Sequence, residues 1–200
     1  MSPKPSKTLT TSATKANLFA LLLTLPVLLV FGLPYLLFWS ERLTDELNWI
    51  AFNSNLFMLL AILVVGIVLH ELIHGAVWAR YCKHGFKSIR FGVMWKSLSP
   101  YCHCTEPLTI KRYRWATLMP GVILGFFPCL LGIITGNLAS LLFGLVFTLA
   151  AGGDFLMIWM LRTESLKSLV QDHPSAIGCY IFEQDVRSNH NPSSRQASNA

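Results

Sequence analysis

Long apolar blocks alternate with short polar segments along this chain. The four longest blocks run over about residues 16–39, 56–79, 115–135 and 138–161. Each contains the roughly 20 residues that an α-helix needs to cross about 30 Å of hydrocarbon. Prolines inside the first and third blocks predict bends, because neighbouring helices can satisfy the carbonyls that proline leaves unpaired. We therefore expect an all-α integral membrane protein with about four transmembrane helices.

The segment between the second and third blocks follows a different period. Polar and apolar residues alternate from Lys87 to Trp95, turn-forming residues follow, and the stretch from Tyr101 to Thr105 is extended in character. This pattern predicts a small β-hairpin over about residues 87–105.

Both ends of the chain are polar. We expect residues 1–15 to be a disordered N-terminal tail and residues 183–200 to be a polar C-terminal tail. Residues 16–182 then form one membrane-embedded domain. Near its end, Asp172-His173-Pro174 breaks the helical pattern, and residues 179–182 predict one more short strand or interfacial segment.

Composition and charge agree with a membrane protein. The chain is 53% hydrophobic and only 13% charged, where soluble domains carry about a quarter charged residues. Of the 16 Lys and Arg residues, all but Arg42 lie before the first block, after the fourth block or in the hairpin-bearing loop. We therefore expect a multi-pass protein of a bacterial inner (plasma) membrane with the hairpin and both termini cytoplasmic. The net charge of +6 then reflects topology and attraction to anionic lipid headgroups, so it requires no nucleic acid partner.

The apolar blocks contain only four ionisable residues: His70, Glu71, His74 and Asp154. A charge inside a span costs several kcal/mol, so each one needs a reason. Residues 70–74 form an HExxH motif, in which the two imidazoles lie on one helix face and can bind one Zn²⁺. Glu71 stands where such sites carry the general base. The alternative is a buried polar cluster that pairs with neighbouring helices.

Asp154 is the candidate for the third protein ligand that a catalytic zinc requires. At 1.5 Å per residue, its depth below the end of its helix falls between the depths of His70 and His74. Gly152 and Gly153 should let the fourth helix approach the second closely. Alternatively, Asp154 hydrogen-bonds a histidine ligand without contacting the metal.

Two lesser sites are also considered. Asp172 and His173 could support the active-site mouth, contact substrate or supply another ligand, although Asp172 and Pro174 could simply shape a turn. The cysteines and histidines in the hairpin-bearing loop suggest a second metal site. However, their spacing does not match a zinc ribbon, and adjacent strand residues point to opposite faces. We expect packed thiols there, without disulfides, since four of the five cysteines would be cytoplasmic.

Several blocks of sequence carry a family resemblance: HELIHG, FGV…SPYCHCTEPL, YRWATLMPG, and AGGDFLMIW with a following DHP. They span residues 69–182 and resemble a family of compact membrane proteins described as "putative zincin peptidases". More broadly the chain is similar to site-2 protease-type intramembrane zinc metallopeptidases. The resemblance implies Zn²⁺ on His70, His74 and Asp154, with Glu71 as general base. The site-2 class places its aspartate in an L-D-G context, where this chain has G-G-D-F.

The sequence therefore predicts an intramembrane zinc metallopeptidase. It would hydrolyse peptide bonds of membrane-associated proteins or peptides through a zinc-activated water, within the lipid bilayer. An edge of the 87–105 hairpin could hold the substrate by strand addition. Two alternatives stay open: a non-enzymatic metal-binding or transport protein, and a catalytically inactive adaptor that binds clients. The substrate and the oligomeric state are not determined by the sequence.

Overall fold

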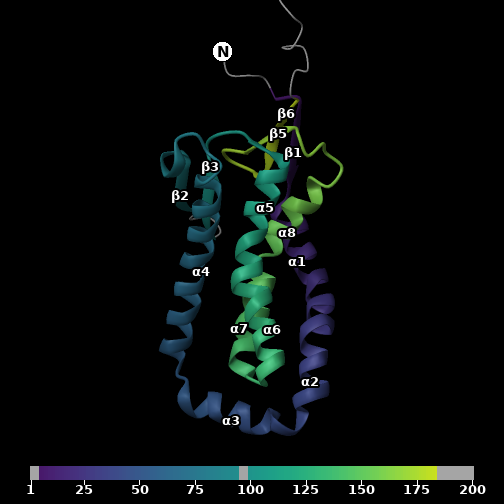
Figure 1. Ribbon diagram of the computed structural model, residues 1–200, viewed down its shortest axis with the longest axis vertical. Coiled ribbons are helices and arrows are strands. Elements are labelled where there is room, and N and C mark those ends of the chain that lie inside the picture. Colours follow the sequence, from purple (N-terminus) through teal and green to yellow (C-terminus); the bar gives the residue numbers. More distant parts are fainter. Residues whose placement is uncertain (1–4, 95–98, 184–200) are drawn as a thin grey trace, which may run out of the picture.

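Apolar helices stand side by side, and two small β-sheets cover one end of them (Figure 1). The computed structural model describes residues 5–94 and 99–183. The helices are α1 (Ala13–Val27), α2 (Leu33–Trp39), α3 (Leu43–Asn53), α4 (Leu56–Ala79), α5 (Ile110–Pro120), α6 (Phe127–Thr135), α7 (Leu138–Ala150) and α8 (Gly152–Met160). The strands are β1 (Lys7–Thr11), β2 (Ile89–Met94), β3 (Ser99–Cys104), β4 (Leu108–Thr109), β5 (Leu169–Asp172) and β6 (Ile177–Phe182). We call the two sheets and their turns the cap.

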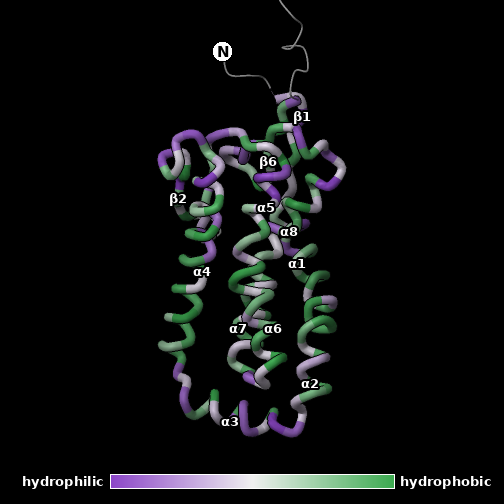
Figure 2. Tube along the Cα trace, viewed as in Figure 1, coloured by the Kyte–Doolittle hydropathy of each residue, from purple (hydrophilic) through white to green (hydrophobic). Residues whose placement is uncertain are grey.

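Three continuous helical stretches are long and apolar enough to span a membrane: Ala13–Asn53, Leu56–Ala79 and Ile110–Thr135. A fourth is present if α7 and α8, which meet at a bend of 42°, are counted as one span. Hydrophobic residues follow these helices, while hydrophilic residues gather in the cap and in α3 (Figure 2). Large apolar side chains such as Phe57, 82% exposed, point outward as they would toward lipid. The expected mainly helical architecture is thus confirmed, with three to four helices long and apolar enough to cross a membrane. The four-stranded sheet of the cap goes beyond the all-α expectation.

Proline bends two of these stretches without ending them. A π-turn over Leu28–Gly32 lies between Pro26 and Pro34, and another over Gly121–Phe126 lies between Pro120 and Pro128. Each proline removes an amide donor and crowds the carbonyl one turn earlier, so the hydrogen bonds shift locally to a wider ring.

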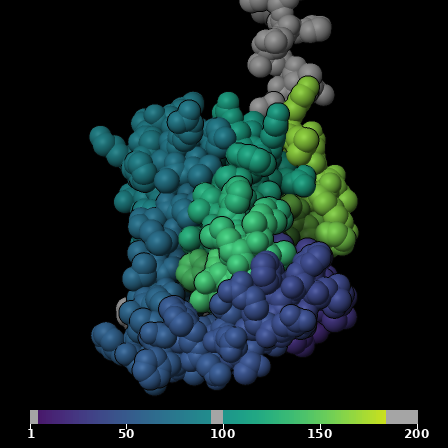
Figure 3. Space-filling model, turned by 60° about the horizontal axis from the view of Figure 1, so that its bottom comes forward, coloured from purple at the N-terminus to yellow at the C-terminus, as the bar shows by residue number. Residues whose placement is uncertain are grey.

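Helix α3 occupies the segment after the first apolar block, where the sequence suggests only a polar loop. It lies across the end of the helices opposite the cap, as Figure 3 shows with this end brought forward. Leu43 and Ile50 pack against a buried cluster that contains Tyr35 and Cys129. Glu46 accepts a 3.1 Å hydrogen bond from the Leu138 amide, at the positive end of α7. Helix α3 therefore fixes where α7 begins.

The cap contains the expected hairpin, β2–β3, in which Phe91 lies opposite Cys102. Its second sheet has the order β1-β6-β5-β4 and is antiparallel throughout. The prediction of a disordered N-terminal tail is wrong for Lys7–Thr11, which forms β1 and pairs with β6. The polar composition of this segment gives no local indication of a strand, and its partner strand lies at the far end of the chain. The pairing also places both ends of the described chain at the cap.

Helices α6 and α7 touch through backbone atoms. A Cβ added at Gly144 would lie 2.4 Å from the Cys129 amide nitrogen and 2.7 Å from the Gly125 carbonyl oxygen. Backbone on both sides leaves no side chain that could rotate away, so glycine is required for this approach.

We predict that Gly144→Ala forces α6 and α7 apart and lowers the free energy of unfolding by about 1–3 kcal/mol, as overpacking does. The loss of stability would appear as a lower midpoint of thermal unfolding for the purified variant in detergent. Gly32→Ala is the matched control, since its added carbon would meet only a leucine methyl at 3.8 Å. Equal midpoints for the two variants would contradict the packing described here.

Candidate metal centre

One stripe of α4 faces the protein while most of the helix faces outward. Gly66, His70, His74 and Trp78 are buried and recur at intervals of four residues. Side chains at that spacing lie above one another on a helix face. Gly66 lets α4 approach α7, because a Cβ there would lie 2.0 Å from the Phe147 ring. Both histidines of the HExxH motif are therefore held on the packed face of α4, one turn apart.

Asp154 of α8 meets both imidazoles. His70 Nε2 lies 3.0 Å from Asp154 Oδ2, and His74 Nε2 lies 3.2 Å from Asp154 Oδ1. A candidate ligand atom from each residue lies within 4.8 Å of the other two. Tetrahedral zinc with bonds near 2.0–2.1 Å separates neighbouring ligand atoms by about 3.3 Å. The spacing of these three side chains therefore fits a zinc ion.

The hydrogen bonds of His74 favour a cation at this point. Its Nδ1 lies 3.3 Å from the Ala116 carbonyl oxygen. A carbonyl can only accept, so Nδ1 carries the hydrogen and Nε2 presents a lone pair toward the Asp154 carboxylate. Two acceptors that face each other need a proton or a metal ion between them. Two imidazoles and a carboxylate are a donor set that suits Zn²⁺.

A bend in the chain brings Asp154 to this position. Helix α7 ends at Ala150, and Asp154 stands in the first turn of α8, just after the bend of 42°. The expected role of the two preceding glycines is wrong. A Cβ at Gly152 would meet Ala20 of α1 at 3.1 Å, and one at Gly153 would meet nothing within 4 Å, so neither glycine packs against α4.

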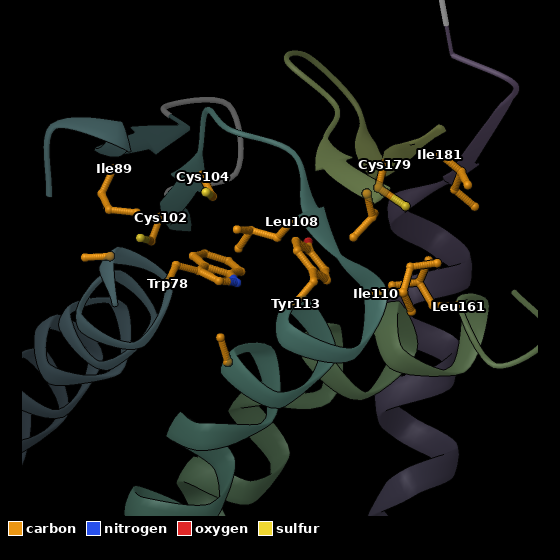
Figure 4. Close-up of a cluster of buried hydrophobic side chains, with 13 residues drawn as sticks. Trp78, Ile89, Cys102, Cys104, Leu108, Ile110, Tyr113, Leu161, Cys179 and Ile181 are labelled. Atoms are coloured by element: carbon orange, nitrogen blue, oxygen red, sulfur yellow. The ribbon is translucent and has the colours of Figure 1, made fainter. Parts of the chain in front are cut away.

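Stacked aromatic rings hold the His74 imidazole in its plane. The His74 and Trp78 rings stack with centroids 5.1 Å apart and an interplanar angle of 17°. Trp78 in turn stacks on Tyr113 at 5.4 Å. Trp78 and Tyr113 belong to the buried cluster beneath the cap, which Figure 4 shows extending from the hairpin to Cys179 and Ile181. The core of the cap therefore fixes the orientation of a candidate ligand.

A cavity of about 470 Å³ opens beside these residues. Glu71, His74 and Asp154 line it from the helices, while residues 100–103 of β3 and 172–178 of the β5–β6 turn line it from the cap. Its size lies within the range typical of small-molecule and peptide side-chain sites. Glu71 faces this cavity without belonging to the three-residue cluster.

The outer backbone edge of strand β3 faces two carboxylates. The Cys104 amide donates to Asp172 at 3.0 Å, and the Cys102 amide interacts favourably with the nearby Glu71 carboxylate. Tyr113 donates its hydroxyl hydrogen to the other Asp172 oxygen. Burial raises the pKa of the Asp172 carboxyl, and these two hydrogen bonds act in the opposite direction. Asp172 therefore joins β5, β3 and α5 directly above the cavity, a link between distant segments that the sequence did not reveal.

The other candidate ligands are placed elsewhere. His173 Nδ1 accepts from the amides of Ser175 and Ala176, and Nε2 lies 3.1 Å from the Tyr180 hydroxyl, so the ring is engaged within the β5–β6 turn. Cys82 and Cys104 bring their Sγ atoms within 3.0 Å as free thiols. Across residues 5–94 and 99–183, only His70, His74 and Asp154 form a group of three that could hold a metal ion.

Comparison with known proteins agrees with this site. A family model described as "Putative zincin peptidase" matches residues 62–168, more than half of the chain. The chain belongs to this family. The matched stretch includes the HExxH motif, the hairpin and Asp154, and the zincin family implies zinc and metallopeptidase activity. No curated protein and no solved structure shows a significant match.

We predict that Asp154→Asn lowers zinc affinity by more than the ~10–100-fold typical of residues that only support a ligand. An amide oxygen carries no charge, so the site loses its only anionic donor. Zinc per protein can be measured by elemental analysis, with affinity taken from competition with a chelator. Asp172→Asn removes one carboxylate from the same cavity outside the cluster and should keep its zinc. Equal zinc loss in both variants would contradict the ligand set.

Proposed function

We propose that this protein is an intramembrane zinc metallopeptidase that hydrolyses peptide bonds of membrane-associated substrates. The observation that carries the proposal is the position of Glu71. It lines the same cavity as His74 and Asp154, yet it is not one of the three clustered side chains. Metal binding alone gives no reason for a further acid within a span, where a charge is costly.

Each residue of the site has a role in this proposal. His70, His74 and Asp154 would hold zinc, which when bound acidifies a water molecule and polarises a carbonyl. Glu71 would serve as the general base, taking a proton from the attacking water and returning it to the amine of the departing peptide. The Ala116 carbonyl, through His74 Nδ1–H, keeps the lone pair of Nε2 directed at the site.

The substrate must reach the cavity as an extended segment, because a helix keeps its carbonyls within its own hydrogen bonds. Strand addition to the hairpin remains our proposal for how that segment is held. The outward amides of Cys102 and Cys104 lie on that edge. Asp172 accepts from the Cys104 amide, and the Cys102 amide interacts favourably with the nearby Glu71 carboxylate. An added strand would take the Cys102 amide with one of its own carbonyls and displace Glu71 from it, while the bond between Cys104 and Asp172 continues to hold β3.

Glu71→Gln should abolish peptide hydrolysis while leaving zinc content unchanged. An amide cannot accept the proton, and general-base contributions are typically about 10²–10⁴-fold. Cleavage would be assayed on a panel of single-span membrane proteins, with protein reconstituted in lipid. Glu41→Gln is the control, since Glu41 is an exposed acid in the turn before α3. Cleavage by Glu71→Gln at the wild-type rate would contradict the general-base role of Glu71. If neither protein cleaves any substrate and both move zinc across vesicle membranes, the protein is a metal carrier and no peptidase.

The link between Asp172 and Tyr113 gives a second test. Asp172→Asn and Tyr113→Phe each weaken the hydrogen bonds by which Asp172 holds β3 in place. Each should therefore raise KM by about 10-fold, the size of one hydrogen bond to a charged group. Zinc content and the pH profile of kcat should stay as in wild type, because neither residue touches the metal or the water. Both substitutions weaken the same hydrogen bond between Tyr113 and Asp172, so their effects should not add in the double variant. Additive effects on KM, or loss of zinc, would contradict the claim that Asp172 and Tyr113 act together to hold β3.

A further inference from the structure

Helices α5 and α8 form a second depression, on a face that does not line the cavity of the metal centre. Its volume is about 400 Å³, and its apolar wall consists of Trp115, Leu118, Phe155 and Ile158. The two helices lie together below the four-stranded sheet (Figure 1). The depression opens toward the surroundings of the helices, where a membrane would supply lipid.

A polar depression of about 350 Å³ adjoins the apolar one nearer the cap. Thr109, Lys111, Arg112, Leu166 and Lys167 line it, and Lys111 and Leu166 belong to both depressions. We call the two together the α5/α8 groove. The groove is thus polar at one end and apolar at the other.

Every charged residue that lines the α5/α8 groove is basic. Lys111, Arg114 and Lys167 make no side-chain hydrogen bond or ion pair with any residue in the described parts of the chain. Glu164, the acid in the segment between α8 and β5, is already paired with Lys7 at 2.5 Å. The groove therefore gathers positive charge that the protein itself does not neutralise.

The height of these residues matches the layers of a bilayer. Leu118 lies seven residues below Lys111 on α5, or about 10 Å at the helical rise. Trp115 and Trp159 are 54% and 55% exposed, and Arg162 covers the Trp159 ring at 4.2 Å. Exposed tryptophans with basic neighbours mark the boundary between headgroups and hydrocarbon. The basic end of the groove thus stands at headgroup level and its apolar end at acyl-chain level.

We propose that the α5/α8 groove binds one anionic glycerophospholipid of the surrounding bilayer. Its phosphate contacts Lys111, Arg114 and Lys167, and one acyl chain follows Trp115 and Phe155. A zwitterionic lipid fits less well because its ammonium group adds a cation to an unneutralised basic site. The bound lipid braces α5 against α8. These helices supply the Ala116 carbonyl to His74 and the Asp154 carboxylate, so anionic lipid stabilises the candidate metal centre from its outer side.

Quenching of Trp115 by brominated lipids tests the proposal. Full-length protein is placed in phosphatidylcholine nanodiscs that contain increasing fractions of phosphatidylglycerol brominated on its acyl chains. The difference between wild type and Trp115→Phe isolates the Trp115 signal. Brominated phosphatidylglycerol should reach half-quenching at about a tenfold lower fraction than brominated phosphatidylcholine, as two or more basic contacts imply. Equal quenching by the two lipids would overturn the proposal.

Charge variants identify the source of selectivity. Lys111→Gln/Lys167→Gln should remove the preference for phosphatidylglycerol, while Lys111→Arg/Lys167→Arg keeps both charges and should retain it. Lys87→Gln/Arg90→Gln is the matched control, because it removes two exposed cations from the hairpin region instead. If both glutamine variants lose the preference equally, the protein has general attraction to anionic lipid and no site. The quenching experiment does not measure peptide cleavage, so its outcome is independent of the proposed peptidase activity.

Discussion

A membrane helix that carries ionisable side chains must provide partners for them inside the protein, since hydrocarbon offers none. The structure meets this constraint at one point. His70 and His74 of α4 meet Asp154 of α8 at 3.0 and 3.2 Å, and the Ala116 carbonyl of α5 accepts a hydrogen bond from His74 Nδ1. Three helices that would otherwise share only apolar surface are thereby joined by polar groups. A divalent ion would complete this arrangement by lying between the Asp154 carboxylate and the two imidazoles.

Much of the remaining structure maintains that convergence. Helix α3 fixes where α7 begins through Glu46, and the bend between α7 and α8 turns the first turn of α8 toward α4. From the other end, the cap holds Tyr113 and Trp78 in a stack that orients the His74 ring. The site therefore depends on elements at both ends of the bundle.

The sequence predicted those features that depend on local pattern. Apolar length located the helices, period-two alternation located the hairpin, and helical spacing placed His70 and His74 on one face. Asp154 was identifiable because the apolar blocks contain no other acid beyond Glu71. Long-range pairing is beyond such patterns: the segment of β1 has the composition of a tail, and its partner β6 lies at the opposite end of the chain. The joining of Asp172 to Tyr113 and Cys104 depends on three segments meeting in space. For the same reason the pattern does not reveal that Gly152 packs on α1 and that Gly153 packs on no helix.

The proposed mechanism gives the hairpin two roles that cannot be fulfilled at once. Its Cys102 amide interacts with the Glu71 carboxylate, and the same amide is the donor that an extended substrate would use on that edge. In the proposed mechanism a free enzyme therefore keeps its base tied to β3, and a docking strand exchanges a peptide carbonyl for that carboxylate. Exchange of one acceptor for another costs little net hydrogen-bond energy, so the competition does not forbid binding. It links release of the base to the presence of a peptide, which confines hydrolysis to segments that can unfold and pair with β3.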